Sequence, residues 1–107
     1  MDPDSALPAR VRAALAGAPA LQEKRMFGSA AFMVRGKLCI TASADRIMCR
    51  IDPALVAAAL EREGCHAVIM RGRPSRGYVY VYAAAVMSSG ALKYWVDLAL
   101  NYNKAIS

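Results

Sequence analysis

The stretch that decides the fold runs from residue 26 to residue 51 and reads MFGSAAFMVRGKLCITASADRIMCRI. Apolar residues alternate through it, and two short breaks of turn-forming residues, Arg35-Gly36 and Ala44-Asp45, interrupt the alternation. The pattern predicts three consecutive antiparallel strands, over Met26–Val34, Lys37–Ser43 and Arg46–Ile51.

The two turns also predict which strand residues face each other. Two-residue loops at both breaks place apolar residues opposite one another on neighbouring strands, which defines one buried face. The predicted pairs are Leu38 with Ile51, Ile40 with Cys49, Ala42 with Ile47, Met33 with Leu38 and Ala31 with Ile40. The predicted core face comprises Phe27, Ala31, Met33, Leu38, Ile40, Ile47, Cys49 and Ile51. The opposite face then carries Ala30, Phe32, Val34, Cys39, Thr41, Met48 and Arg50. This second face is too apolar for solvent alone, so we expect a further layer or another subunit to cover it.

Helices and a second group of strands surround this meander. The first helix is predicted over Ser5–Ala16, where Leu7, Val11 and Leu15 form an apolar stripe. The elements predicted after the meander are a helix capped by Asp52 and ending near Glu63, a strand over His66–Met70, a basic loop over Arg71–Gly77, a strand over Tyr78–Ala83, and a helix from Ser88 or Ser89 to about Ala105. The order helix–three strands–helix–two strands–helix predicts a two-layer α+β fold with a mainly antiparallel sheet, as a single domain over residues 1–107.

Composition narrows the class of protein. The hydrophobic fraction is 57%, but no apolar run approaches the roughly 20 residues that span a bilayer. The chain begins with the acidic residues Asp2 and Asp4, which is not typical of a secretory signal peptide. We therefore expect a cytoplasmic protein without a membrane partner, whose three cysteines are free thiols.

The residues offer no catalytic or metal site. The single histidine, His66, follows Cys65, and adjacent strand residues point to opposite faces, so a Cys–His dyad is geometrically poor. Cys39 and Cys49 are predicted on opposite faces, which argues against a disulfide. One histidine and no CxxC pair are too few ligands for zinc. We expect a protein that is not an enzyme and has no cofactor.

Binding is the remaining class of function. The net charge of +6 favours acidic partners, although solubility alone also accounts for it. Tyrosine and valine alternate in the last strand, which places the tyrosines on one face. The candidate partner or dimer face comprises Phe32, Cys39, Tyr78, Tyr80 and Tyr82. The alternative is a nucleic-acid contact made by Arg71, Arg73 and Arg76, with the tyrosines stacking on bases.

Two motifs resemble a known family. Residues 25–38, RMFGSAAFMVRGKL, look like the opening hairpin of the TfoX (Sxy) N-terminal domain, with Ser29 where a second glycine is usual. Residues 72–79, GRPSRGYV, resemble its second signature, and Trp95 its last-helix tryptophan. The similarity extends over about residues 10 to 105 and implies the same order of helices and strands.

The resemblance also implies a regulatory setting. Named members of the family regulate natural competence in bacteria together with a cyclic-AMP receptor protein, and they carry a helical C-terminal domain. This chain is expected to be a stand-alone member without that domain. The family has no established catalytic residues. The expected function is a non-enzymatic interaction module that binds a protein partner or itself; the alternative is a nucleic-acid-binding protein.

Overall fold

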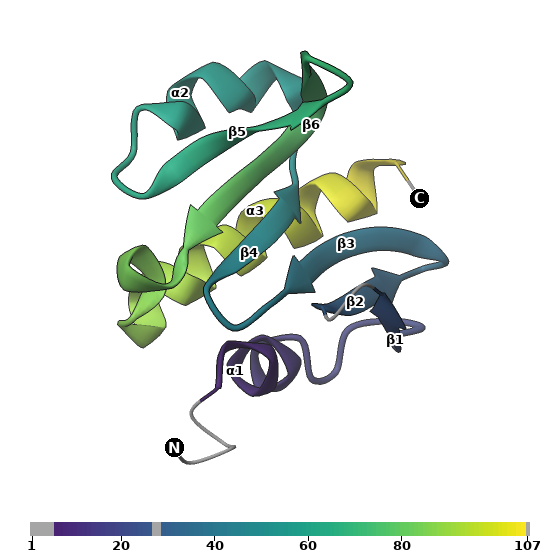
Figure 1. Ribbon diagram of the computed structural model, residues 1–107. Coiled ribbons are helices and arrows are strands. Elements are labelled where there is room, and N and C mark those ends of the chain that lie inside the picture. Colours follow the sequence, from purple (N-terminus) through teal and green to yellow (C-terminus); the bar gives the residue numbers. More distant parts are fainter. Residues whose placement is uncertain (1–5, 27–28, 107) are drawn as a thin grey trace.

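The computed structural model describes residues 6–26 and 29–106 of the chain (Figure 1). Its elements, in chain order, are α1 (Leu7–Ala14), β1 (Gln22–Met26), β2 (Ser29–Val34), β3 (Lys37–Ala42), β4 (Arg46–Arg50), the 3-10 helix η2 (Pro53–Leu55), α2 (Val56–Leu60), β5 (Cys65–Met70), β6 (Arg73–Tyr82), the 3-10 helix η3 (Ala83–Val86) and α3 (Ser89–Ile106). The predicted α+β class is confirmed.

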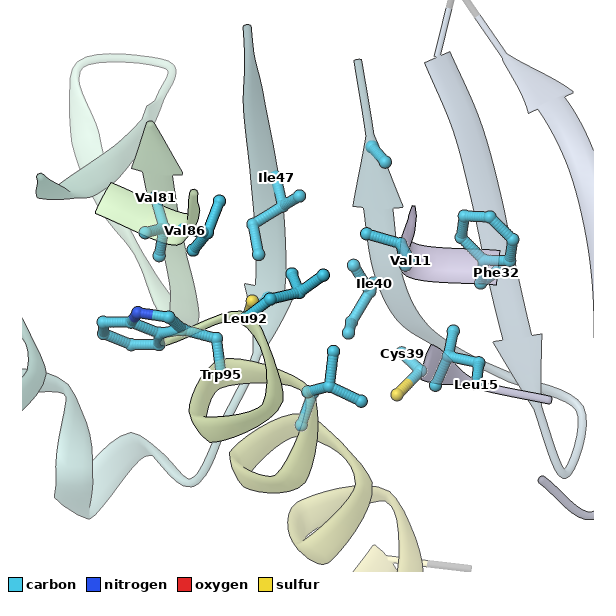
Figure 2. Close-up of a cluster of buried hydrophobic side chains, with 14 of the residues drawn as sticks. Val11, Leu15, Phe32, Cys39, Ile40, Ile47, Val81, Val86, Leu92 and Trp95 are labelled. Atoms are coloured by element: carbon cyan, nitrogen blue, oxygen red, sulfur yellow. The ribbon is translucent and has the colours of Figure 1, made fainter. Parts of the chain in front are cut away.

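The strands form one antiparallel sheet in the order β1-β2-β3-β4-β6-β5. The three helices pack on one face of it, and α3 passes behind β4 in Figure 1. Figure 2 shows Leu92 and Trp95 of α3 beside Ile47 of β4, with Val11 and Leu15 from the α1 side of the same cluster. A single hydrophobic core therefore lies between the sheet and the helices.

Strand β1 is an element that the sequence pattern did not predict. Its sequence, QEKRM, lacks the apolar alternation that identifies a half-buried strand. The strand pairs with β2 along the edge of the sheet, and Glu23 forms a two-point ion pair with Arg12 of α1 at 2.6 and 2.7 Å. Its charged residues suit an edge, where charge discourages pairing with another chain.

The pairing of β3 with β4 confirms the predicted register. Ile40 lies opposite Cys49 and Ala42 opposite Ile47, and all four are buried. The valines of β6 face the same core, because Val79 lies opposite Cys49.

The predicted register between β2 and β3 is correct only near the turn. Met33 lies opposite Leu38 as predicted, but the register then shifts by one residue, and Phe32 lies opposite Ile40. Cys39 is the unpaired extra residue. The extra residue reverses the alternation along β3, so that Ile40 faces the core with Phe32 whereas Leu38 lies with Met33 on the other side of the sheet.

This shift corrects the predicted faces of β2 and β3. Phe32 and Cys39 were predicted to point outward, but they are only 0% and 1% exposed, and Figure 2 shows both beside Leu15. Met33 and Leu38, predicted in the core, are half-buried on the other side of the sheet. Phe27 lies outside the described residues.

The loop predicted over Arg71–Gly77 is mostly strand. The turn consists of Arg71 and Gly72 alone, both with positive φ (53° and 76°), and β6 begins at Arg73. Two consecutive residues with positive φ are typical of the tight turn that joins antiparallel strands. Pro74 is tolerated in β6 because this end of the strand pairs only with β5, whereas β4 reaches no further than Tyr78.

Candidate interaction face

The side of the sheet away from the helices is what we call the open face. One row of side chains crosses it from strand to strand, because Thr41 lies opposite Met48, Met48 opposite Tyr80, and Tyr80 opposite His66. Members of this face on either side of the row are Met33, Leu38, Arg46, Arg50, Tyr78 and Tyr82. All of them are half-buried or exposed.

Cationic and aromatic side chains meet on this face. The guanidinium carbon of Arg46 lies 3.8 Å from the centroid of the Tyr80 ring. The His66 and Tyr82 rings meet edge to face, with centroids 4.9 Å apart and planes at 77°. An exposed cation–π pair contributes about 0.5–1 kcal/mol, which favours the stacked position of Arg46 by a factor of about two to five. The open face therefore presents positively charged side chains above aromatic and apolar ones.

A hollow of about 540 Å³ lies between β3, β4 and β6 on the open face. Leu38, Met48 and Tyr80 contribute apolar surface, while Asp45 and Arg46 supply charge. Met70, at the end of β5, also lines it. Ser29, Thr41 and Ser43 add hydroxyl groups, so the hollow combines apolar, hydroxyl and charged surface.

The residues predicted for the partner or dimer face fall into two groups. Tyr78, Tyr80 and Tyr82 lie together on the open face, as their alternation predicted. Phe32 and Cys39 belong to the core and are not accessible to a partner.

The predicted nucleic-acid residues, Arg71, Arg73 and Arg76, are all exposed on the β5–β6 hairpin. Arg46, Met48 and His66 were not predicted as site residues. Only the pairing of β4 and β5 with β6, strands that are separated in the sequence, brings them beside the tyrosines.

The cysteines are buried, and burial keeps their thiols in the protonated, unreactive form. Burial raises the pKa of Cys39 to about 11 and raises the pKa of Cys49 still further. Burial also raises the pKa of Cys65, which the nearby Arg62 partly opposes. A thiol is nucleophilic as the thiolate, so these side chains stay protonated and inert at neutral pH. Cys65 is buried while His66 is exposed, as expected for adjacent strand residues.

In the described part of the chain, no group of three or more His, Cys, Asp or Glu side chains could hold a metal ion. None of the described helices is both long enough and apolar enough to cross a membrane.

Comparison with known families decides the family of the chain. Residues 13–102 match the model of the TfoX N-terminal domain. The chain belongs to the TfoX N-terminal domain family. No curated protein and no solved structure gives a match. The matched residues of this TfoX N-terminal domain include the whole sheet, and with it the open face.

Proposed function

We propose that this TfoX N-terminal domain is a non-enzymatic interaction module, accessory to transcriptional regulation, that binds a protein partner on the open face. The observation that carries the proposal is that, within residues 6–26 and 29–106, helices cover only one side of the sheet. The other side presents Met48, Tyr80 and Tyr82 without a covering layer. An uncovered apolar and aromatic surface of this kind is typical of a binding site.

The charges on the face indicate the kind of partner. Arg46 lies on it, Arg50 reaches from its border towards Tyr102 of α3 (5.9 Å to the ring centroid), and the whole chain carries a net charge of +6. A positive surface attracts a negative one and accelerates their encounter. The partner is therefore a protein that presents acidic residues around an apolar patch.

A matched pair of variants tests the face. Tyr80 stacks with Arg46 on the open face, and Tyr94 stacks with Arg62 on the helical side at nearly the same distance, 3.9 Å. We expect Tyr80→Ala to lose the proteins that wild type retains from a lysate of the native cell, as measured by quantitative mass spectrometry. Tyr94→Ala should retain them. Equal retention by the two variants would contradict the proposal.

Nucleic acid is the second candidate, and the Arg46–Tyr80 stack favours it. Aromatic rings beside arginines can bind single-stranded bases and phosphates. This candidate predicts that binding of a labelled single-stranded oligonucleotide weakens steeply between 50 and 200 mM salt. Removal of a phosphate contact by Arg73→Ala should reduce the slope of log affinity against log salt by about 0.7. Binding that does not change with salt would exclude it.

A further inference from the structure

The two edge strands of the sheet differ in their protection. The edge strand β1 carries three consecutive charged residues, Glu23, Lys24 and Arg25. The other edge strand, β5, reads CHAVIM and contains no Asp, Glu, Lys or Arg. An edge strand presents unpaired backbone N–H and C=O groups, and charged side chains are the common device that prevents pairing with another chain. Only β1 has that device.

Apolar side chains are exposed at the unprotected edge. Ile69 is 57% exposed and Met70 is 52% exposed, both at the end of β5. In the described part of the chain β5 pairs with β6 on one side and with no strand on the other. The edge therefore combines a free side with apolar surface, as strands that receive another strand do.

Charges at the two ends of β5 specify the occupant. Glu61, Arg62 and Glu63 precede the strand, with the Arg62 guanidinium stacked on Tyr94 of α3, and Arg71 and Arg73 follow it. A second β5 running antiparallel brings each acidic end beside a basic end. A parallel arrangement would bring like charges together. The charges at the two ends of β5 are therefore complementary to those of a second, antiparallel β5.

We propose that β5 pairs antiparallel with β5 of a second copy of this chain, so that the two sheets become one. A two-fold axis perpendicular to the sheet keeps the corresponding faces of the two copies on the same side of the joined sheet. Each residue of β5 must therefore lie opposite a residue whose side chain points to the same face. Pairing centred on Ala67 satisfies this condition and brings Glu63 of each copy towards Arg71 of the other, in the turns that flank β5. The open faces of both copies then lie on the same side.

The pairing uses the backbone edge of β5, whereas the proposed function uses side chains of the open face; Met70 lies at both, and neither proposal depends on the other. The pairing also replaces the predicted dimer face, since Phe32 and Cys39 are buried. The tyrosines stay accessible in the paired form, because pairing uses the edge and not the face.

Sedimentation velocity over a range of protein concentrations tests the pairing. We expect wild type to dimerise, and Ile69→Lys to raise the dimer dissociation constant tenfold or more, because the lysine places a charge on the edge. The matched control is Met87→Lys, which removes a side chain that is 76% exposed outside β5. It should leave the dissociation constant unchanged. A wild type that stays monomeric at every concentration would overturn the proposal, as would equal effects of the two variants.

A charge swap tests the register and keeps the test informative if Ile69→Lys fails to fold. Glu63 and Arg71 are both exposed and outside the strand. Glu63→Arg alone and Arg71→Glu alone should each weaken dimerisation several-fold, through like charges opposite one another. The double variant should restore it. A double variant as weak as the single variants would refute the proposed pairing.

Discussion

The only buried polar side chain among the described residues is that of Asn103, which is 2% exposed. Its Nδ2 donates a hydrogen bond to the carbonyl oxygen of Val34 at 2.8 Å, and its Oδ1 accepts one from Nη1 of Arg35 at 3.3 Å. A buried polar group is costly unless it is hydrogen-bonded. This side chain satisfies a backbone carbonyl at the end of β2 and ties the last turns of α3 to the sheet.

Substitution of Asn103 should destabilise the fold through that carbonyl. We expect Asn103→Ala to lower the free energy of unfolding by about 1–3 kcal/mol, because the Val34 carbonyl loses its partner. Urea unfolding followed by circular dichroism measures the loss. Asn101→Ala, an exposed position on the same helix, is the control for helix propensity. Equal losses in the two variants would contradict the assigned role.

The buried thiols make stability depend on pH in the alkaline range. Burial raises the pKa of Cys39 from an ordinary 9.0 to about 11. Between these values the unfolded chain has lost the proton and the folded chain retains it, so the free energy of unfolding falls as pH rises. The fall due to one such group is at most about 1.4 kcal/mol per pH unit.

The measurement compares wild type with Cys39→Ala in urea titrations from pH 8 to pH 11. The difference in stability between the two proteins should shrink as the pH rises through this window. A constant difference across it would show that Cys39 ionises at the same pH in both states.

At the scale of elements, the sequence pattern correctly predicted the features that depend on residues close together in the chain. The stripe of α1, the β3–β4 register and the alternation in β6 are all confirmed, because each depends on a short stretch of chain. The sequence pattern did not reveal that Cys39 is an extra residue, because both faces of this stretch are apolar. Strand β1 was missed because its polar sequence suits an edge. Short-range pattern thus identifies buried strands better than it identifies edges or bulges.

Packing at Gly64 yields a prediction of the same scale. A Cβ added there would lie 2.4 Å from Cβ of Ala85, and φ is +79°. Gly36 has a similar φ of +77° and nothing within 4 Å of such a Cβ. Both Gly→Ala variants carry the backbone cost of about 1 kcal/mol, and only Gly64→Ala adds a clash between the β5 start and η3.

Thermal or urea unfolding should therefore rank Gly64→Ala below Gly36→Ala in stability. Adding Ala85→Gly to Gly64→Ala should recover the part of the loss that comes from the clash, although glycine in η3 carries its own small cost. If the second substitution recovers nothing, the close contact between these residues is not the cause.

At the scale of the whole molecule, strands that are distant in the sequence assemble the candidate site. Arg46 and Tyr80 stack only because β4 pairs with β6, with β5 on the outside. The alternation of tyrosines predicted one strand of the open face. No local pattern could add Arg46, Met48 or His66, because their neighbours are fixed by the strand order.

The strand order predicts where backbone amides are best protected. Strands β2, β3, β4 and β6 each have a paired neighbour on both sides, whereas β1 lies at an edge. We expect hydrogen exchange measured by mass spectrometry to be slowest in these four strands and clearly faster in β1. Equal protection of β1 and β4 would contradict this topology.

The strand order also decides when the open face can exist during folding. Strands β1 to β4 each pair with a chain neighbour, and β5 and β6 form a hairpin, so both groups can form locally. The pairing between the groups, with Ile47 opposite Val81, must close a loop that contains η2, α2 and β5. Loop closure costs entropy before its contacts form, so we expect this seam to be completed last. Until then the tyrosines lie in one half of the chain and Arg46 in the other, and the open face is complete only when the two halves have joined.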